Sequence, residues 1–221
     1  MDLFDDVGAK LSASRAKLKF TDADARHVGL RGMQEVIAGY AFGFSSMVRD
    51  GSADGLRSTD QIYASYGKSN LAPDEMRKLV ENAWKNGLLT LFHFKLDCLF
   101  QNLMKAMGTY EARCGYGKMT GQILKACNLN DQRTRDVLAL VGYLRNSLHN
   151  NGMHRGPDLS IEIADMKYDL RKDKAVACAG WQHIFSAFEE TITILDEILA
   201  APVIQKLSVP IPDDYASNPV D

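Results

Sequence analysis

The chain of 221 residues is long enough to bury a substantial core, and its 46% hydrophobic and 24% charged residues are typical of a folded globular protein. A formal net charge of -2 argues against a general nucleic-acid binder, because such proteins carry a strongly basic surface. No apolar run approaches the roughly 18 residues of a membrane span, and the acidic N-terminus differs from a secretory signal. We therefore expect a cytoplasmic protein without a membrane partner.

The first part of the chain, residues 1–60, predicts a helical extension. Residues 3–19 permit a short helix, and a second helix can begin near Thr21 or Asp22 and run to about Arg49. Residues 50–60 are rich in Gly, Ser and Asp, which predicts a loop.

Three glycines mark the second of these helices. Gly32, Gly39 and Gly43 follow one another at spacings of seven and four, so they share one helix face. The pattern indicates either a close contact with another helix, which a second subunit could supply, or a helix weakened by its glycines at about 1 kcal/mol each.

Residues 61–201 predict a helical bundle. A long helix begins at Pro73, where Asp74 and Glu75 complement the positive end of the helix dipole, and it runs to about Met107. A helix of this length usually forms the spine of a bundle. His93 and Asp97, four residues apart on it, predict a surface or edge pair; a metal site needs a third ligand, which the sequence does not offer nearby.

The second half of the chain adds more helices and a small β element. The segment GYGKMTG, residues 115–121, lacks phosphate-loop spacing and predicts a loop into a helix that ends at Cys127. Asn130 or Asp131 then caps a helix to about residue 150.

A small β element is predicted next. LSIEI and MKYDL alternate with period two, and RKDK can turn the chain into a further short strand through Ala177. A last helix covers residues 181–200, and the proline-containing tail, residues 202–221, is expected to be extended or disordered. The predicted fold class is mainly α, a helical bundle with a small β-hairpin before the last helix.

The four cysteines predict no site. Cys98, Cys114, Cys127 and Cys178 are far apart in the sequence, without a C-x-x-C pair or a neighbouring His ladder. We expect reduced, mostly buried thiols, and neither a metal nor a cofactor.

The stretch RNSLHNNG, residues 145–152, holds the candidate site. On a helix, Arg145 and His149 lie close together at the edge of an apolar stripe, and Asn146 and Asn150 form a second pair beside them. No Asp or Glu occurs between Val137 and Pro157, so this is the most anion-seeking part of the chain. His154 and Arg155 follow directly and are candidates for substrate binding. The plainer interpretation is a helix end, where cations are favoured and an Asn-Gly pair forms an ordinary cap.

The Arg-Asn-x-x-His motif, together with the helix order from Pro73 to Ala200, resembles the HEPN superfamily (higher eukaryote and prokaryote nucleotide-binding domains). The resemblance implies a compact helical bundle, commonly dimeric, and an activity found in many members, metal-independent RNA cleavage in toxin, antiviral or RNA-processing systems. Arg145, Asn146 and His149 would then be the catalytic residues, with Asn150, His154 and Arg155 binding the substrate.

The sequence leaves two classes of function open. As a nuclease, the chain would use His149 as general base and Arg145 to stabilise the phosphate, with a second copy completing the site; RNA or a nucleotide is then the partner. Only three residues separate Arg145 from His149, fewer than is usual in the family. The alternative is therefore a noncatalytic module with a degenerate motif, which binds a protein or a nucleotide.

Overall fold

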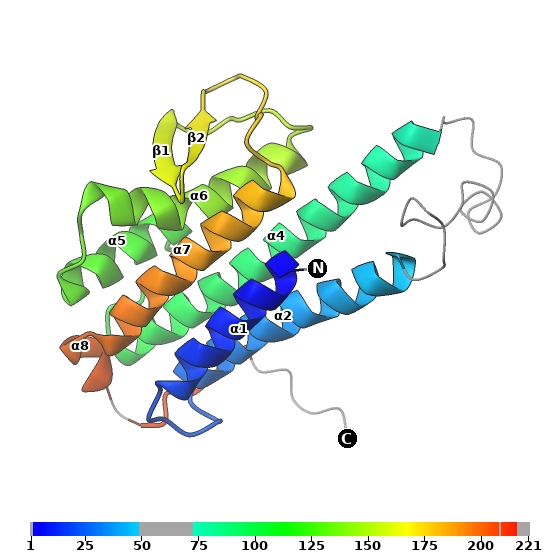
Figure 1. Ribbon diagram of the computed structural model, residues 1–221. Coiled ribbons are helices and arrows are strands. Elements are labelled where there is room, and N and C mark those ends of the chain that lie inside the picture. Colours follow the sequence, from blue (N-terminus) through cyan, green and yellow to red (C-terminus); the bar gives the residue numbers. More distant parts are fainter. Residues whose placement is uncertain (1, 49–72, 208, 216–221) are drawn as a thin grey trace.

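The computed structural model describes residues 2–48, 73–207 and 209–215. Within these ranges the chain forms seven helices and one two-stranded antiparallel sheet (Figure 1). The elements are α1 (Asp2–Ala16), α2 (Ala25–Val48), α4 (Pro73–Ala106), α5 (Tyr116–Cys127), α6 (Gln132–His149), β1 (Leu159–Ile163), β2 (Met166–Leu170), α7 (Trp181–Ala200) and α8 (Pro202–Gln205). The predicted fold class is confirmed: the protein is mainly helical, with a small hairpin before α7. None of the described helices combines the length and hydrophobicity that a transmembrane segment requires.

The two long helices α4 and α7 form the centre of the bundle (Figure 1). The rings of Phe92 on α4 and Phe188 on α7 stack with their centroids 3.9 Å apart. Helix α1 packs on α7 and helix α2 on α4, and α5 and α6 each contact both long helices. A single hydrophobic cluster runs through all of them, from Phe4 of α1 to Ile204 of α8.

The glycines of α2 make room for α4. A Cβ atom added at Gly32 would lie 3.0 Å from the Lys95 side chain, and one added at Gly43 would lie 2.6 Å from the Trp84 ring. Gly39 faces open space. The close helix contact that the glycine spacing predicted thus lies within the chain, at two of the three positions. Helix α2 continues without a break across all three glycines.

Helix α2 begins at a buried ion pair between Asp24 and Arg26, and not at a cap on Thr21 or Asp22. The guanidinium of Arg26 donates to the Asp24 carboxylate at 2.6 Å, and both side chains are fully buried. Asp24 also accepts hydrogen bonds from the backbone N–H groups of Arg26 and Ile211, each at 3.0 Å. One carboxylate therefore starts the helix and fastens the C-terminal segment to it.

The hairpin has the predicted strands but no third one. Strands β1 and β2 pair from Leu159 with Leu170 to Ile163 with Met166. The expected strand after RKDK is wrong, because the chain forms only an isolated bridge between Met153 and Ala175. The left-handed backbone of Asp173, with φ of 59°, turns residues 171–176 away from the hairpin and toward residues 152–155.

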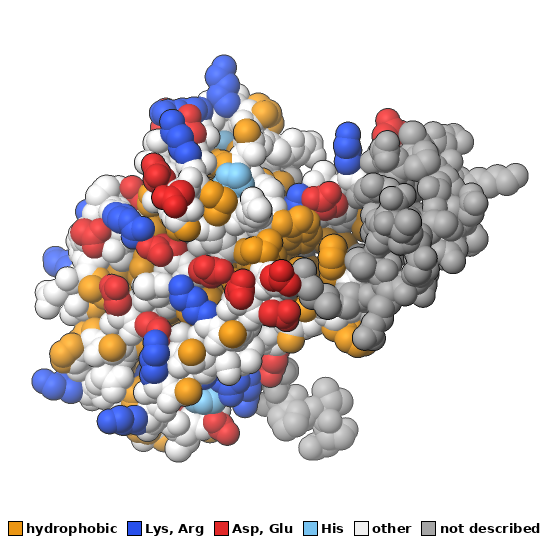
Figure 2. Space-filling model, viewed as in Figure 1, with side chains coloured by type: hydrophobic (Ala, Val, Ile, Leu, Met, Phe, Trp, Pro, Cys, Tyr) orange, Lys and Arg blue, Asp and Glu red, His pale blue; other side chains and the backbone are white. Residues whose placement is uncertain are grey.

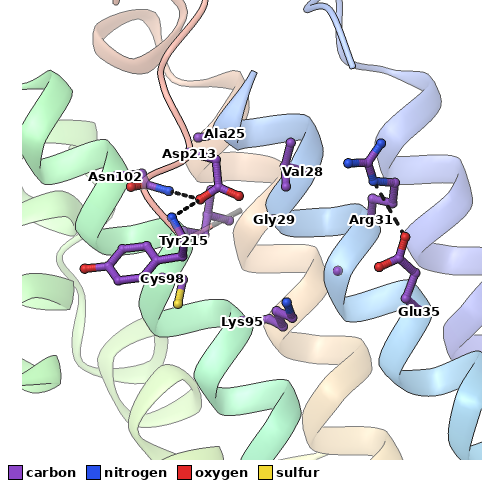
Figure 3. A pocket seen from close by; sticks show the side chains of 12 residues that line it. Ala25, Val28, Gly29, Arg31, Glu35, Lys95, Cys98, Asn102, Asp213 and Tyr215 are labelled. Carbon is purple, nitrogen blue, oxygen red and sulfur yellow. Dashed lines mark hydrogen bonds and ion pairs between the residues drawn. The ribbon is translucent and has the colours of Figure 1, made fainter. Parts of the chain in front are cut away.

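The proline-containing tail is more ordered than expected. Residues 202–205 form the helical turn α8, and residues 209–215 lie against α2 and α4. The side chain of Asn102 on α4 donates to Asp213 at 2.8 Å. Figure 3 marks this hydrogen bond with a dashed line. The expectation of an extended or disordered tail is wrong for this part, because Ile211 is buried in the core and polar contacts hold its neighbours. Residues 216–221, and the predicted loop at 50–60, lie outside the described residues.

The cysteines behave as the sequence predicted. All four carry free thiols, and Cys98, Cys127 and Cys178 are buried. Burial raises the pKa of Cys98 to about 11, and it raises the pKa of Cys127 to about 11 as well. Because the thiolate is the reactive form, these two side chains act as inert core groups at neutral pH.

Candidate functional site

An open hollow of about 430 Å³ lies at the C-terminal end of α6. Its lining residues are Tyr143, Arg145, Asn146, His149, Asn150, His154, Arg155 and Gly156. All six residues that the sequence singled out are among them, and no carboxylate lines the hollow. Its volume falls within the roughly 300–1,000 Å³ that is usual for small-molecule sites. The combination of size and positive charge makes it the candidate anion site of the molecule.

Helix α6 presents the polar residues because its other side is anchored in the core. Val137, Val141 and Leu144 are fully buried, and Asp131 caps the helix by accepting the backbone N–H of Thr134 at 2.9 Å. Arg145 follows Leu144 and therefore lies at the edge of the buried stripe. The helix ends at Asn150, and the left-handed residues Asn151 and Gly152 turn the chain back, as the Asn-Gly pattern predicted.

Arg145 is half-buried and has no ion-pair partner among the described residues. Its Nε atom is buried without a hydrogen-bond partner. An unsatisfied buried donor costs about 1–3 kcal/mol, and more when the group is charged, so an anion that accepts from this atom would remove that cost. A guanidinium offers paired N–H donors that match the oxygens of a phosphate.

His149 is oriented by a hydrogen bond with helix α4. Its Nε2 atom lies 3.0 Å from the Thr90 hydroxyl of α4. When Nε2 carries the proton it donates to Thr90, and the lone pair of Nδ1 is left to accept a proton from a ligand. The side chain is exposed, so the ring combines a fixed orientation with access to solvent.

The two asparagines differ in their roles. Asn146 is exposed, and no hydrogen bond engages its side chain within the described part of the chain. Asn150 closes the helix with its backbone N–H, which donates to the carbonyl groups of Asn146 and Ser147. Both amide side chains border the hollow and are placed to hydrogen-bond a ligand there.

His154 belongs to the wall of the hollow. It is only 1% exposed, and its Nε2 atom donates to the Pro157 carbonyl at 2.8 Å. The Nδ1 atom lies 3.2 Å from the Ser147 hydroxyl. Both ring nitrogens are thus engaged inside the protein, which leaves none for the substrate contact that the sequence predicted.

Arg155 reaches the hollow from the loop after α6. It forms a 2.5 Å ion pair with Asp173, and both side chains are more than half exposed. Exposed ion pairs contribute about 0–1 kcal/mol, so this one can readily be exchanged for a phosphate. Arg155 therefore remains a candidate for substrate binding.

Helix α4 contributes a group that sequence reasoning misjudged. The expected surface or edge pair is wrong for His93, which is 8% exposed. Its ring lies 4.5 Å from that of Tyr116, centroid to centroid, and its Nε2 atom would be 3.1 Å from a Cβ atom at Gly142. Burial, and secondarily the charge of Arg145, lowers the pKa of His93 to about 4. The imidazole is therefore neutral at pH 7.

Asp97, one turn further along α4, is half-buried on the same side. Burial raises its pKa, although a hydrogen bond from Gln101 and the charge of Arg145 oppose the rise. Thr90, His93 and Asp97 follow at spacings of three and four, which place them on one face of a helix. This spacing is the signal that would have predicted a shared face toward α6.

The wider surface carries charges of both signs. Figure 2 shows Lys and Arg side chains interspersed with Asp and Glu over the visible face. This agrees with the small net charge and leaves the hollow as a local cationic feature. Electrostatic binding of an anion would therefore be confined to the hollow and its rim.

No family model, no curated protein and no solved structure matches this chain. The fold and the site together define a mainly helical protein with an acid-free, cationic hollow at the end of one helix.

Proposed function

We propose that this protein is a HEPN-like, metal-independent endoribonuclease that binds an RNA phosphate in the hollow and cleaves beside it. The observation that carries the proposal is Arg145: a half-buried guanidinium that forms no ion pair within the described residues, in a hollow that His149 also lines. The resemblance of the Arg-Asn-x-x-His motif supplies the reaction class. Membership of a toxin or antiviral system is part of the same proposal and rests on the resemblance alone.

In this reaction the ribose 2′-oxygen attacks the neighbouring phosphorus. Nδ1 of His149 takes the 2′-hydroxyl proton, the new O2′–P bond forms, and the P–O5′ bond breaks. Arg145 donates to the phosphate oxygens, where negative charge builds up in the transition state, and Asn146 hydrogen-bonds the phosphate. The 5′-oxygen leaves with a proton from an acid. The products are a 2′,3′-cyclic phosphate and a 5′-hydroxyl, and no metal takes part.

A second copy of the chain supplies the acid in this proposal. Leu91 and Phe94 of α4 are 43% and 50% exposed, and they follow Thr90, the partner of His149, by one and four residues. Burying two large apolar side chains beside the site would stabilise a two-fold dimer, since apolar area contributes about 25 cal/mol per Å². Such a dimer would bring two His149 rings to one groove, one as base and one as acid.

The test is incubation of purified protein with total RNA in EDTA. We expect cleavage by the wild type, and a loss of about 100-fold or more in His149→Ala, the usual effect of a lost acid-base group. His183→Ala is the matched control, because His183 is half-buried on α7 and does not line the hollow. Full activity in His149→Ala would refute the assignment.

A second candidate is a noncatalytic nucleotide-binding module with the same hollow. The hydrogen bond between Thr90 and His149 favours it, because one ring nitrogen is already engaged. This protein would bind RNA or a nucleotide through Arg145 and Asn146 without cleaving it. Binding without products, in the same assay, would select this reading.

A further inference from the structure

A chain of hydrogen bonds leads from the C-terminal segment to the edge of the candidate site. The Tyr215 hydroxyl donates to Oε1 of Gln101, and Nε2 of Gln101 donates to the Asp97 carboxylate at 2.8 Å. Tyr215 is held on α4 by its neighbours, since Lys105 pairs with Asp214 at 2.7 Å and Asn102 donates to Asp213. Figure 3 shows this docking, with Asp213 and Tyr215 beside Asn102.

The packing of α4 on α6 brings Asp97 and Arg145 toward the same buried point. His93 of α4 lies against Gly142 of α6. Asp97 is one turn beyond His93, and Arg145 is about one turn beyond Gly142. Helical side chains lean toward the N-terminus of their own helix, so both side chains lean back toward this contact. Asp97 and Arg145 accordingly interact electrostatically, but no direct ion pair joins them.

We propose that Asp97 positions Arg145 for the phosphate, and that Gln101 and Tyr215 hold Asp97 in place. The inference rests on the proposed function and assigns to α4 and the C-terminal segment a part in the same site. A carboxylate that interacts with the guanidinium without pairing with it attracts the group and leaves its donors unsaturated. Arg145 therefore keeps its N–H groups free for an anion while its direction is fixed.

The network has features of a positioning device. The Gln101 amide donates to Asp97 and accepts from Tyr215, so each hydrogen bond polarises the next. Asp97 is half-buried, where its field is screened less than at the surface. Tyr215 is 38% exposed and lies outside the hollow, so it acts on Arg145 only through Gln101 and Asp97.

The direction in which Asp97→Asn changes the affinity for phosphate distinguishes a positioning role of Asp97 from a purely electrostatic one. If Asp97 only added negative charge near the hollow, Asp97→Asn would tighten the binding of an anion. If Asp97 positions Arg145, the same change weakens binding, because the guanidinium loses its fixed direction. We expect affinity for inorganic phosphate to fall roughly 5-fold or more, the lower end of the usual range for coupling between sites. Tyr215→Phe should act in the same direction with a smaller effect.

The experiment follows the Nε–Hε resonance of Arg145 in full-length protein by NMR, with phosphate as the titrant and Arg145→Lys to assign the signal. Asp136→Asn is the matched control for Asp97→Asn, because Asp136 on α6 also accepts from a glutamine on its own helix, Gln132 four residues earlier, at 2.7 Å. Asp214→Asn removes the ion pair with Lys105 but keeps the Tyr215 hydroxyl, so it controls for a weaker attachment of the C-terminal segment to α4. Melting curves identify variants that fail to fold.

We expect the Arg145 resonance to shift in Asp97→Asn and in Tyr215→Phe, and to stay in place in both controls. An unchanged resonance, or tighter phosphate binding in Asp97→Asn, would overturn the inference. Absence of phosphate binding by the wild type would count against the proposed function instead. The resonance shifts would then still decide whether Asp97 positions Arg145.

Discussion

His93 should make the protein lose stability between pH 7 and pH 5. Burial, with a secondary effect of the Arg145 charge, lowers its pKa from 6.5 to about 4. In this pH range the unfolded chain binds a proton that the folded chain does not, so protonation favours unfolding. The contribution is small above pH 6.5, grows as the pH falls, and is complete below the folded pKa. With these two pKa values, linkage gives a loss of about 2 kcal/mol between pH 7 and pH 5.

Urea unfolding of the wild type and of His93→Gln at both pH values measures this contribution. The variant removes the titrating group, so it should lose about 2 kcal/mol less than the wild type over the same interval. Its absolute stability at pH 7 does not enter the comparison. His183→Gln changes a half-buried histidine on α7, away from His93, and serves as the control for a generic histidine substitution. Equal losses in the wild type and His93→Gln would refute the reasoning.

Four further substitutions test the packing of α2 and the proposed dimer interface. Asp24→Ala leaves the Arg26 guanidinium buried without its partner and should cost about 3–5 kcal/mol in urea unfolding; a cost under 1 kcal/mol would contradict it. Gly39→Ala should raise the melting temperature, since a helical alanine is better by about 1 kcal/mol and the position is open. Gly43→Ala should lower it, because the new Cβ meets the Trp84 ring; equal shifts in the two would be inconsistent with this packing. Phe94→Glu should convert a wild-type dimer to a monomer in sedimentation, and a persisting dimer would exclude this face as the interface.

Local patterns predicted most of the fold because they are set by neighbouring residues. The period of the apolar stripe located α6, and Asp131 capped it as expected. The two strands followed from their alternation. The order of the tail could not be predicted this way, because it depends on the contact of Ile211 with Asp24, which lies 187 residues earlier.

The candidate site shows the same limit. Arg145, Asn146 and His149 could be proposed as a candidate site from the sequence because they lie within about one helical turn of each other. Thr90 could not be recognised as the partner of His149, since the contact requires knowing that α4 packs on α6. His154 was misjudged for a related reason. Its sequence neighbours are polar, but the fold of residues 152–157 buries its ring.

The most direct test of the account is to locate where RNA binds. A short RNA with a 2′-O-methyl group at every position has no free 2′-hydroxyl, so it cannot form the cyclic product and remains intact. It can therefore be titrated into labelled protein and followed by NMR. The account predicts shift changes concentrated at the C-terminal end of α6 and at residues 154–156, with a strong change at the Arg145 Nε–Hε signal. Their absence there, or a set of changes confined to other helices, would contradict the claim that this hollow holds an RNA phosphate.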